Sequence, residues 1–161
     1  MLPWQQKTSA EDHCCAVFYV SISFNMLSQE LHTMSYYFSK TVPGEFDAII
    51  QKVTAALKNE GFGVLTEIDV KSTLKQKIGV DFRSYRILGA CNPSLAHKAL
   101  TAEDKIGTML PCNVIVQDLG GGHIEVAAIN PLAAMEKVGN RELTEIAAEV
   151  AGRLQAVVNS L

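Results

Sequence analysis

Residues Tyr85–Pro93, with the sequence YRILGACNP, join a strand pattern directly to a helix start. The apolar run that ends at Cys91 is typical of an inner β-strand. Asn92 can accept a hydrogen bond from the first turn of a helix, and Pro93 suits the first helical position because no N–H donor is needed there. We therefore expect a strand that is followed at once by a helix to about Thr101.

Strand and helix patterns continue on both sides of this stretch. Alternating or β-branched runs predict further strands, and apolar residues that recur every three or four positions predict further helices. The expected strands span residues 36–42, 62–70, 110–117 and 124–129, and the expected helices span 45–59, 71–78, a short piece from 131, and 142–159. Because hairpin and crossover connections are mixed, we predict an α+β fold. It would have two layers, with a mixed or mostly antiparallel sheet of about five strands and helices packed on one face.

The composition and charge of the chain limit the classes of protein to which it can belong. The chain has 161 residues, of which 48% are hydrophobic and 19% are charged, as expected for a folded domain. Its formal net charge of -3 argues against binding to nucleic acid through bulk positive charge. The four cysteines form no C-x-x-C pair, and no apolar stretch is long enough to span a membrane. We therefore expect a reduced, cytoplasmic protein without a nucleic-acid or membrane partner.

Residues 1–33 differ in patterning from the rest of the chain. Their apolar run, Cys14–Leu27, keeps neither a strand nor a helix period. The run is too short to span a bilayer, and acidic rather than basic residues precede it, unlike in a signal peptide. We predict that residues 1–33 are an N-terminal extension, disordered or due to the assignment of the gene start, with a genuine strand as the alternative. Residues 34–161 would form a single α+β domain.

The expected strand over residues 62–70 alternates between two kinds of side chain. One face would carry the following residues: Phe62, Val64, Thr66, Ile68 and Val70. Leu65, Glu67 and Asp69 would lie on the opposite, solvated face. The two carboxylates could act as an acid–base pair or bind a divalent ion, although solvated charges on a strand face are more common.

Cys91 is the first candidate for chemistry. Directly before a capped helix, its thiol would lie at the positive end of the helix dipole, which lowers a thiol pKa and favours the thiolate. We therefore consider Cys91 a reactive or ligand-contacting thiol. The alternative is a buried cysteine that packs as a small hydrophobic residue.

Cys112 and Asn113 repeat the Cys-Asn pair at the start of another expected strand. If the two strand ends lie close together, Cys91 and Cys112 could form a redox pair or, with His97, an anion or metal site. His97 could also act as a general base. A fourth metal ligand would have to be His123, which lies in an expected hairpin turn that should face solvent. We therefore predict no metal site and no cofactor.

Long segments of the chain resemble a known family. These segments are Gly61–Val70, Lys77–Arg83, Tyr85–Pro93, Ala96–Leu100 and Leu110–Val114. Through them, residues 34–161 resemble the bacterial and archaeal family called domain of unknown function 302, DUF302. The resemblance implies a small α+β domain that assembles as a homodimer, and it implies no established activity.

Two hypotheses about function follow. The first is a homodimeric module that binds or senses a small ligand, for which an anion is the first candidate because helix N-termini attract anions. Its ligand-binding residues would be Cys91, Asn92, Pro93, His97, Cys112 and Asn113. The second is a thiol-dependent redox protein or enzyme, with Cys91, His97 and Cys112 as candidate catalytic residues. A purely structural dimer is a third alternative, and the residues alone do not decide between them.

Overall fold

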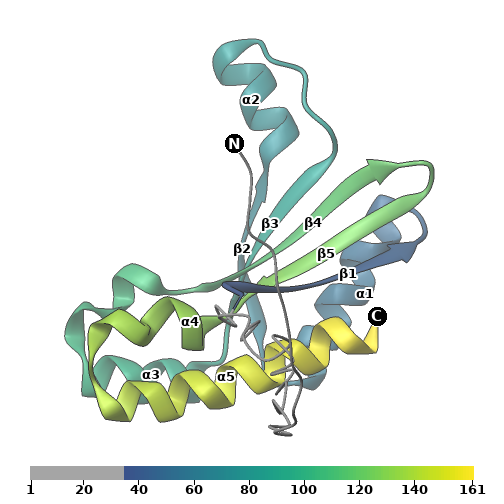
Figure 1. Cartoon of the computed structure of the whole chain (residues 1–161). Coiled ribbons are helices and arrows are strands. Elements are labelled where there is room, and N and C mark those ends of the chain that lie inside the picture. Colours follow the sequence, from purple (N-terminus) through teal and green to yellow (C-terminus); the bar gives the residue numbers. More distant parts are fainter. Residues whose placement is uncertain (1–34) are drawn as a thin grey trace, which may run out of the picture. The chain divides into compact units, whose positions relative to one another are not determined.

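The computed structural model describes residues 35–161, so the predicted N-terminal extension, residues 1–33, lies outside the described residues. Strands and helices follow one another along the described chain (Figure 1). The strands are β1 (Tyr37–Pro43), β2 (Gly63–Asp69), β3 (Tyr85–Cys91), β4 (Cys112–Gly120) and β5 (His123–Ile129). The α-helices are α1 (Phe46–Asn59), α2 (Val70–Ile78), α3 (Pro93–Ala102), α4 (Pro131–Met135) and α5 (Arg141–Ser160), and 3-10 helices span Asp104–Met109 and Glu136–Val138.

The strands form one antiparallel sheet in the order β1-β5-β4-β3-β2. The predicted α+β fold with five strands is confirmed, and β3 has the bounds that its sequence predicts. β4 is shifted relative to the predicted strand over residues 110–117. It begins at Cys112 rather than Leu110, and it continues through Asp118 to Gly120, so that Gly121 and Gly122 turn the chain. The 3-10 helix Asp104–Met109 was not predicted.

Helices pack on one face of the sheet, as predicted (Figure 1). The hydrophobic core forms between that face and the apolar stripes of α1 and α5. Its fully buried side chains include Val53, Leu57, Leu154 and Val157 from the helices, and Leu88, Val114, Val116 and Val126 from the strands. Because burial of one such side chain contributes roughly 1.5–3 kcal/mol, this contact between the layers dominates the stability of the fold.

The opposite face of the sheet has no α-helix packed over its centre in the part of the chain that the structure describes. The strand register aligns Ile68 with Ile87, Ile87 with Ile115, and Ile115 with Ala127 across four strands. Cross-strand partners point to the same side of a sheet, so these residues share one surface. We call this surface, on the side away from α1 and α5, the open face.

The predicted sidedness of β2 is wrong beyond Val64. The register shifts between Val64 and Thr66, which is the signature of a β-bulge. A bulge adds one residue and so reverses which side chains point to each face of the sheet. Glu67 therefore pairs with the buried Leu88 on the helix side, and Ile68 lies on the open face with 48% of its surface exposed.

α2 extends away from the sheet and the other helices (Figure 1). It begins where the Asp69 carboxylate accepts a hydrogen bond from the Ser72 N–H, and it ends at Gly79, whose φ of 71° is left-handed. None of its side chains is buried, and Ile78 is 65% exposed. The domain thus carries an arm that adds nothing to the core. Among the helices of residues 35–161, none has the length and apolar character needed to cross a membrane.

Among the glycines that the structure describes, Gly89 has the closest neighbours. A Cβ at this position would lie 2.3 Å from Thr66 Oγ1 and 2.8 Å from Pro111 Cγ. Both distances are too short for non-bonded atoms, and each neighbour is held on or beside an adjacent strand. Only glycine therefore fits between Thr66 and Pro111.

We expect Gly89→Ala to lower the free energy of unfolding by about 2 kcal/mol or more, because the added methyl group overpacks the site. Chemical denaturation followed by circular dichroism measures the effect. Gly152→Ala is the matched control, because that glycine is an exposed residue of α5 with no atom near the added Cβ. The control should stabilise the protein by about 0.5–1 kcal/mol. Equal effects of the two substitutions would contradict the packing argument.

Candidate functional site

Of the predicted site residues, Cys91, Asn92 and Cys112 line a very small cavity at the start of α3. Cys91 and Asn92 lie on one side of it, and Cys112 from β4 and Met135 from α4 also line it. The remaining wall is largely apolar and includes Phe62, Leu95, Ile146 and Val150. The cavity volume is about 30 Å³. We call it the thiol cavity; it has room for roughly one water molecule and not for an organic ligand.

The local sequence explains why α3 starts here. The Asn92 side chain accepts a hydrogen bond from the Leu95 N–H at 3.2 Å, and Pro93 occupies the first turn. The predicted capping is therefore confirmed. Because the Asn92 oxygen is used by the helix, it is not free to accept from a ligand in the cavity.

Burial governs the chemistry of the two thiols. Burial raises the pKa of Cys91 above its ordinary value of 9.0. Burial, with a smaller contribution from the charge of Cys91, raises the pKa of Cys112 to about 11. Cys112 is only 6% exposed. The predicted lowering of the Cys91 pKa is wrong, because burial disfavours the charged thiolate.

The structure separates the other predicted residues. His97 is exposed and lies with Glu142 and Glu145 in a groove between α3 and α5, away from the thiol cavity. Pro93 is exposed at the first turn of α3. Within residues 35–161, no three His, Cys, Asp or Glu side chains converge as metal ligands. His97 therefore does not complete a site with the two thiols.

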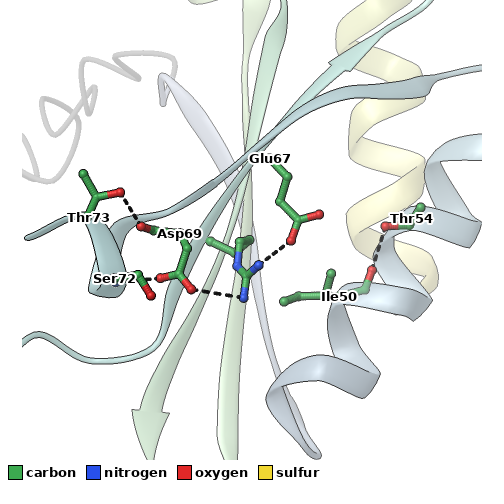
Figure 2. A network of polar contacts seen from close by, with 7 residues as sticks. Ile50, Thr54, Glu67, Asp69, Ser72 and Thr73 are labelled. Atoms are coloured by element: carbon green, nitrogen blue, oxygen red, sulfur yellow. Dashed lines mark hydrogen bonds and ion pairs between the residues drawn. The ribbon is translucent and has the colours of Figure 1, made fainter. Parts of the chain in front are cut away.

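Glu67 and Asp69 are held by one guanidinium group (Figure 2). Arg86 of β3 forms ion pairs with Glu67 and, at 3.5 Å, with Asp69. Asp69 also accepts from Ser72 at 2.9 Å, and this bond is the main cause of its lowered pKa. Arg86 pairs in register with Asp69 and with the buried Val116, so the cluster lies on the helix side near α1. Both carboxylates are therefore engaged in ion pairs with Arg86, unlike a free acid–base pair.

A much larger cavity lies on the open face. Its volume is about 450 Å³. Its lining residues are Tyr36, Tyr37, Arg83, Tyr85, Asn113, Ile115, Gln117, Glu125, Ala127, Ala128 and Ile129. We call it the open-face cavity. Of the predicted site residues, Asn113 is the one that lines it.

A chain of polar side chains crosses one end of the open-face cavity. Arg83 donates to Gln117 Oε1 from Nε at 2.8 Å and from Nη2 at 2.6 Å, and Gln117 Nε2 donates to Glu125. The Arg83 guanidinium also lies over the rings of Phe82 and Tyr85, at 4.7 Å and 5.7 Å from their centroids. Such contacts fix a guanidinium in place. The cavity thus has a preorganised polar end.

The sequence analysis missed this group of residues. Tyr85, Gln117 and Glu125 are register partners on three adjacent strands. The sequence signal that could have found them is the alternation of side chains along β3, β4 and β5. Because residues two positions apart in a strand point to the same side, the alternation predicts that these side chains share one face of the sheet. Burial raises the pKa of Tyr85, so its phenol is neutral at pH 7 and can donate a hydrogen bond.

Comparisons with known proteins identify relatives. Residues 38–161 match the family model described as domain of unknown function DUF302. A crystal structure of an uncharacterized conserved DUF302 protein from Bacillus stearothermophilus is 30% identical in sequence, with a TM-score of 0.71. The match covers 77% of this chain and 96% of that one. No curated protein matches the chain. The comparisons thus supply a family and a fold without an activity.

We expect the pH midpoint for alkylation of Cys91 by iodoacetamide to lie above 9.0, because the raised pKa delays formation of the reactive thiolate. Mass spectrometry of the Cys91 peptide after timed labelling measures this midpoint. The same peptide labelled in denaturant is the control, since unfolding removes the burial. A midpoint for the native protein below that of the unfolded chain would contradict the prediction. It would instead support the hypothesis that Cys91 is an activated thiolate.

Proposed function

Because the chain belongs to the DUF302 family, whose description names no activity, we propose its function from its own geometry: it is a small-ligand-binding module whose ligand occupies the open-face cavity. The observation that carries the proposal is the cavity itself. Its volume of about 450 Å³ lies in the range of roughly 300–1,000 Å³ that is typical of ligand pockets. The single domain that we assign to residues 34–161 supplies all the lining residues.

The open-face cavity replaces the helix start at Pro93 as the ligand site. The thiol cavity has a volume of about 30 Å³ and a wall that is largely apolar, so it cannot hold the small organic ligand expected from the sequence. Asn113 is exposed and lines the larger cavity. We keep the ligand-binding hypothesis and assign the ligand to the opposite face of the sheet.

The lining favours a flat, mainly apolar ligand with one anionic group. Ile115 and Ala127 form an apolar floor, and the rings of Tyr37 and Tyr85 can pack against a flat molecule. At the polar end, two of the five N–H donors of Arg83 face Gln117. The remaining donors can bind a carboxylate or sulfonate oxygen. Glu125, held by Gln117, can accept from a ligand donor.

We expect 8-anilinonaphthalene-1-sulfonate, which has flat rings and one sulfonate, to bind with one equivalent per folded chain. Arg83→Ala should weaken its binding about tenfold or more, because a hydrogen bond to a charged group contributes roughly 1.5–3 kcal/mol. A fluorescence titration measures the affinity, and near-UV circular dichroism verifies that each variant is folded.

Arg141→Ala is the matched control for this titration. Arg141 has a side chain that is 94% exposed and lies at the start of α5, outside the open-face cavity. Its removal should leave the affinity unchanged. If Arg83→Ala and Arg141→Ala bind the probe equally well, the open-face site is wrong.

A thiol-dependent redox role for Cys91 and Cys112 is the second candidate function. The shared thiol cavity favours it, because it brings both cysteines to one place. Their raised pKa values oppose it, since both thiols are protonated at pH 7 and Cys112 is buried. The ligand-binding function therefore ranks first.

A homodimer formed through α2 is the partner we propose for this module. The apolar residues Val70, Leu74 and Ile78 recur every four positions along α2, and none is buried. A nine-residue helix is marginal by itself in water and gains from packing against a partner. Lys75 of α2 is paired with Asp81. Lys71 and Lys77 are complementary to Glu142 and Glu145, which share the groove between α3 and α5 with Lys98. Two reciprocal contacts between arm and groove would give a symmetric dimer.

We expect light scattering to give the mass of a dimer for the wild-type protein and of a monomer for Ile78→Glu. A charge at the exposed end of the arm makes its burial against a second copy unfavourable. Leu119→Glu is the control, because Leu119 is also an exposed apolar residue, at 52%, and lies near the β4–β5 turn. A monomeric wild-type protein, or a dimer that survives Ile78→Glu, would contradict the role of α2.

A further inference from the structure

A second apolar cavity adjoins the open-face cavity at the end opposite Arg83. It lies among the start of β4, the end of β5, α4 and the 3-10 helix Asp104–Met109, and its volume is about 330 Å³. Its apolar lining residues include Met109, Leu110, Pro111, Pro131, Ala134 and Met135. The Thr108 hydroxyl in its wall already donates to the backbone oxygen of Lys105. We call this space the tail cavity.

The two cavities meet on one face of the sheet. Asn113 and Ile129 line both of them. Asn113 pairs in register with Gly89, and a Cβ on Gly89 would lie 2.8 Å from Pro111 Cγ, so the Pro111 ring lies on the open face. Because residues two apart in a strand point to the same side, Asn113 also shares that face with Ile115 in the floor of the open-face cavity. A molecule on the open face can therefore pass from one cavity into the other without crossing the sheet.

The joined space is polar at one end and apolar at the other. Gln117, which binds Arg83, and Asn113, at the junction, are four residues apart along β4, a span of roughly 14 Å. On the other side of Arg83 lies a cavity that shares Arg83 and Gln117 with the open-face cavity. Its further polar lining residues are Lys71, Ser84 and Asp118. An apolar chain that starts at Arg83 is therefore buried toward Asn113 and meets polar groups in the other direction.

We propose that the ligand of this module is a single-chain amphiphile, with an anionic head group at Arg83 and an unbranched hydrocarbon tail that continues past Asn113 into the tail cavity. The inference rests on the proposed function and names the class of its ligand. The donors of Arg83 that do not face Gln117 suit a carboxylate head group. An extended hydrocarbon chain is flat and apolar, so it can lie along the floor formed by Ile115 and Ala127.

The residues beyond the junction suit such a tail. Asn113 is exposed, so its amide can stay in contact with water while the chain packs against Ile129. Met109 and Met135 have flexible side chains that adapt to the shape of an apolar ligand. A compact probe such as 8-anilinonaphthalene-1-sulfonate needs the open-face cavity alone, whereas a long chain needs both cavities. The two kinds of ligand can therefore be separated by experiment.

The test titrates the full chain with octanoate, decanoate, dodecanoate and tetradecanoate, each below its micelle concentration. Calorimetry and displacement of 8-anilinonaphthalene-1-sulfonate measure the affinities. We expect one bound carboxylate per chain and an affinity that rises through the series. Because burial of one methylene tightens binding about fourfold, tetradecanoate should bind about a hundredfold or more tighter than octanoate. Arg83→Ala should weaken the binding of each carboxylate about tenfold or more, since the head group loses its charged partner.

Ala134→Trp tests the tail cavity. Ala134 lines the tail cavity and not the open-face cavity, so the larger side chain fills the space meant for the tail. The substitution should weaken the binding of tetradecanoate about tenfold or more, because several methylenes lose their burial. It should leave the affinities for octanoate and for 8-anilinonaphthalene-1-sulfonate unchanged. Circular dichroism verifies folding, and Met109→Trp, which fills the same cavity, replaces this variant if it does not fold.

Ala133→Trp is the matched control, because Ala133 precedes Ala134 in α4 and lines neither cavity. Its affinity for tetradecanoate should be unchanged. Loss of probe binding, or probe binding that does not depend on Arg83, would overturn the proposed function and this inference with it. If the probe binds through Arg83 but the carboxylate affinity does not rise beyond octanoate, or if Ala134→Trp keeps full affinity for tetradecanoate, the long-chain ligand alone is overturned.

Discussion

Burial of one face of the sheet by α1 and α5 is the constraint on which the other features depend. An antiparallel sheet points alternate residues to opposite sides, so the burial of Leu88 and Val114 under the helices determines that Ile87 and Ile115 face away. The open face and its cavity are consequences of this packing. The bulge in β2 adds a local exception, because it turns Glu67 and Asp69 toward the helices, where Arg86 balances their charge.

Much of the fold was predictable from local signals. The α1 and α5 stripes, the Asn92-Pro93 helix start and the apolar β3 each depend on residues that are close in sequence, so single-chain patterns predict them. The sidedness of β2 was not predictable in this way. Its residues alternate regularly, and the bulge becomes visible only in the pairing of Thr66 with Gly89. That pairing is a contact between strands rather than a property of one strand.

The candidate site was less predictable, because its properties come from volume and burial. The Cys-Asn pairs drew attention to Cys91 and Cys112, which both line the thiol cavity. The sequence could not show that this cavity is too small for an organic molecule, or that burial would raise both pKa values. The polar chain of Arg83, Gln117 and Glu125 comes from three segments, and none of the three is unusual in its own segment.

The position of α2 between two paired strands has an evolutionary consequence. β2 and β3 are neighbours in the sheet, so a short turn could join them, yet the chain makes an excursion through residues 70–84. The helix in that excursion contributes no buried side chain. Substitutions on the exposed surface of α2 can therefore accumulate without disturbing the hydrophobic core. Arg83, at the end of the same excursion, is tied to the sheet through Gln117 and does not share this freedom.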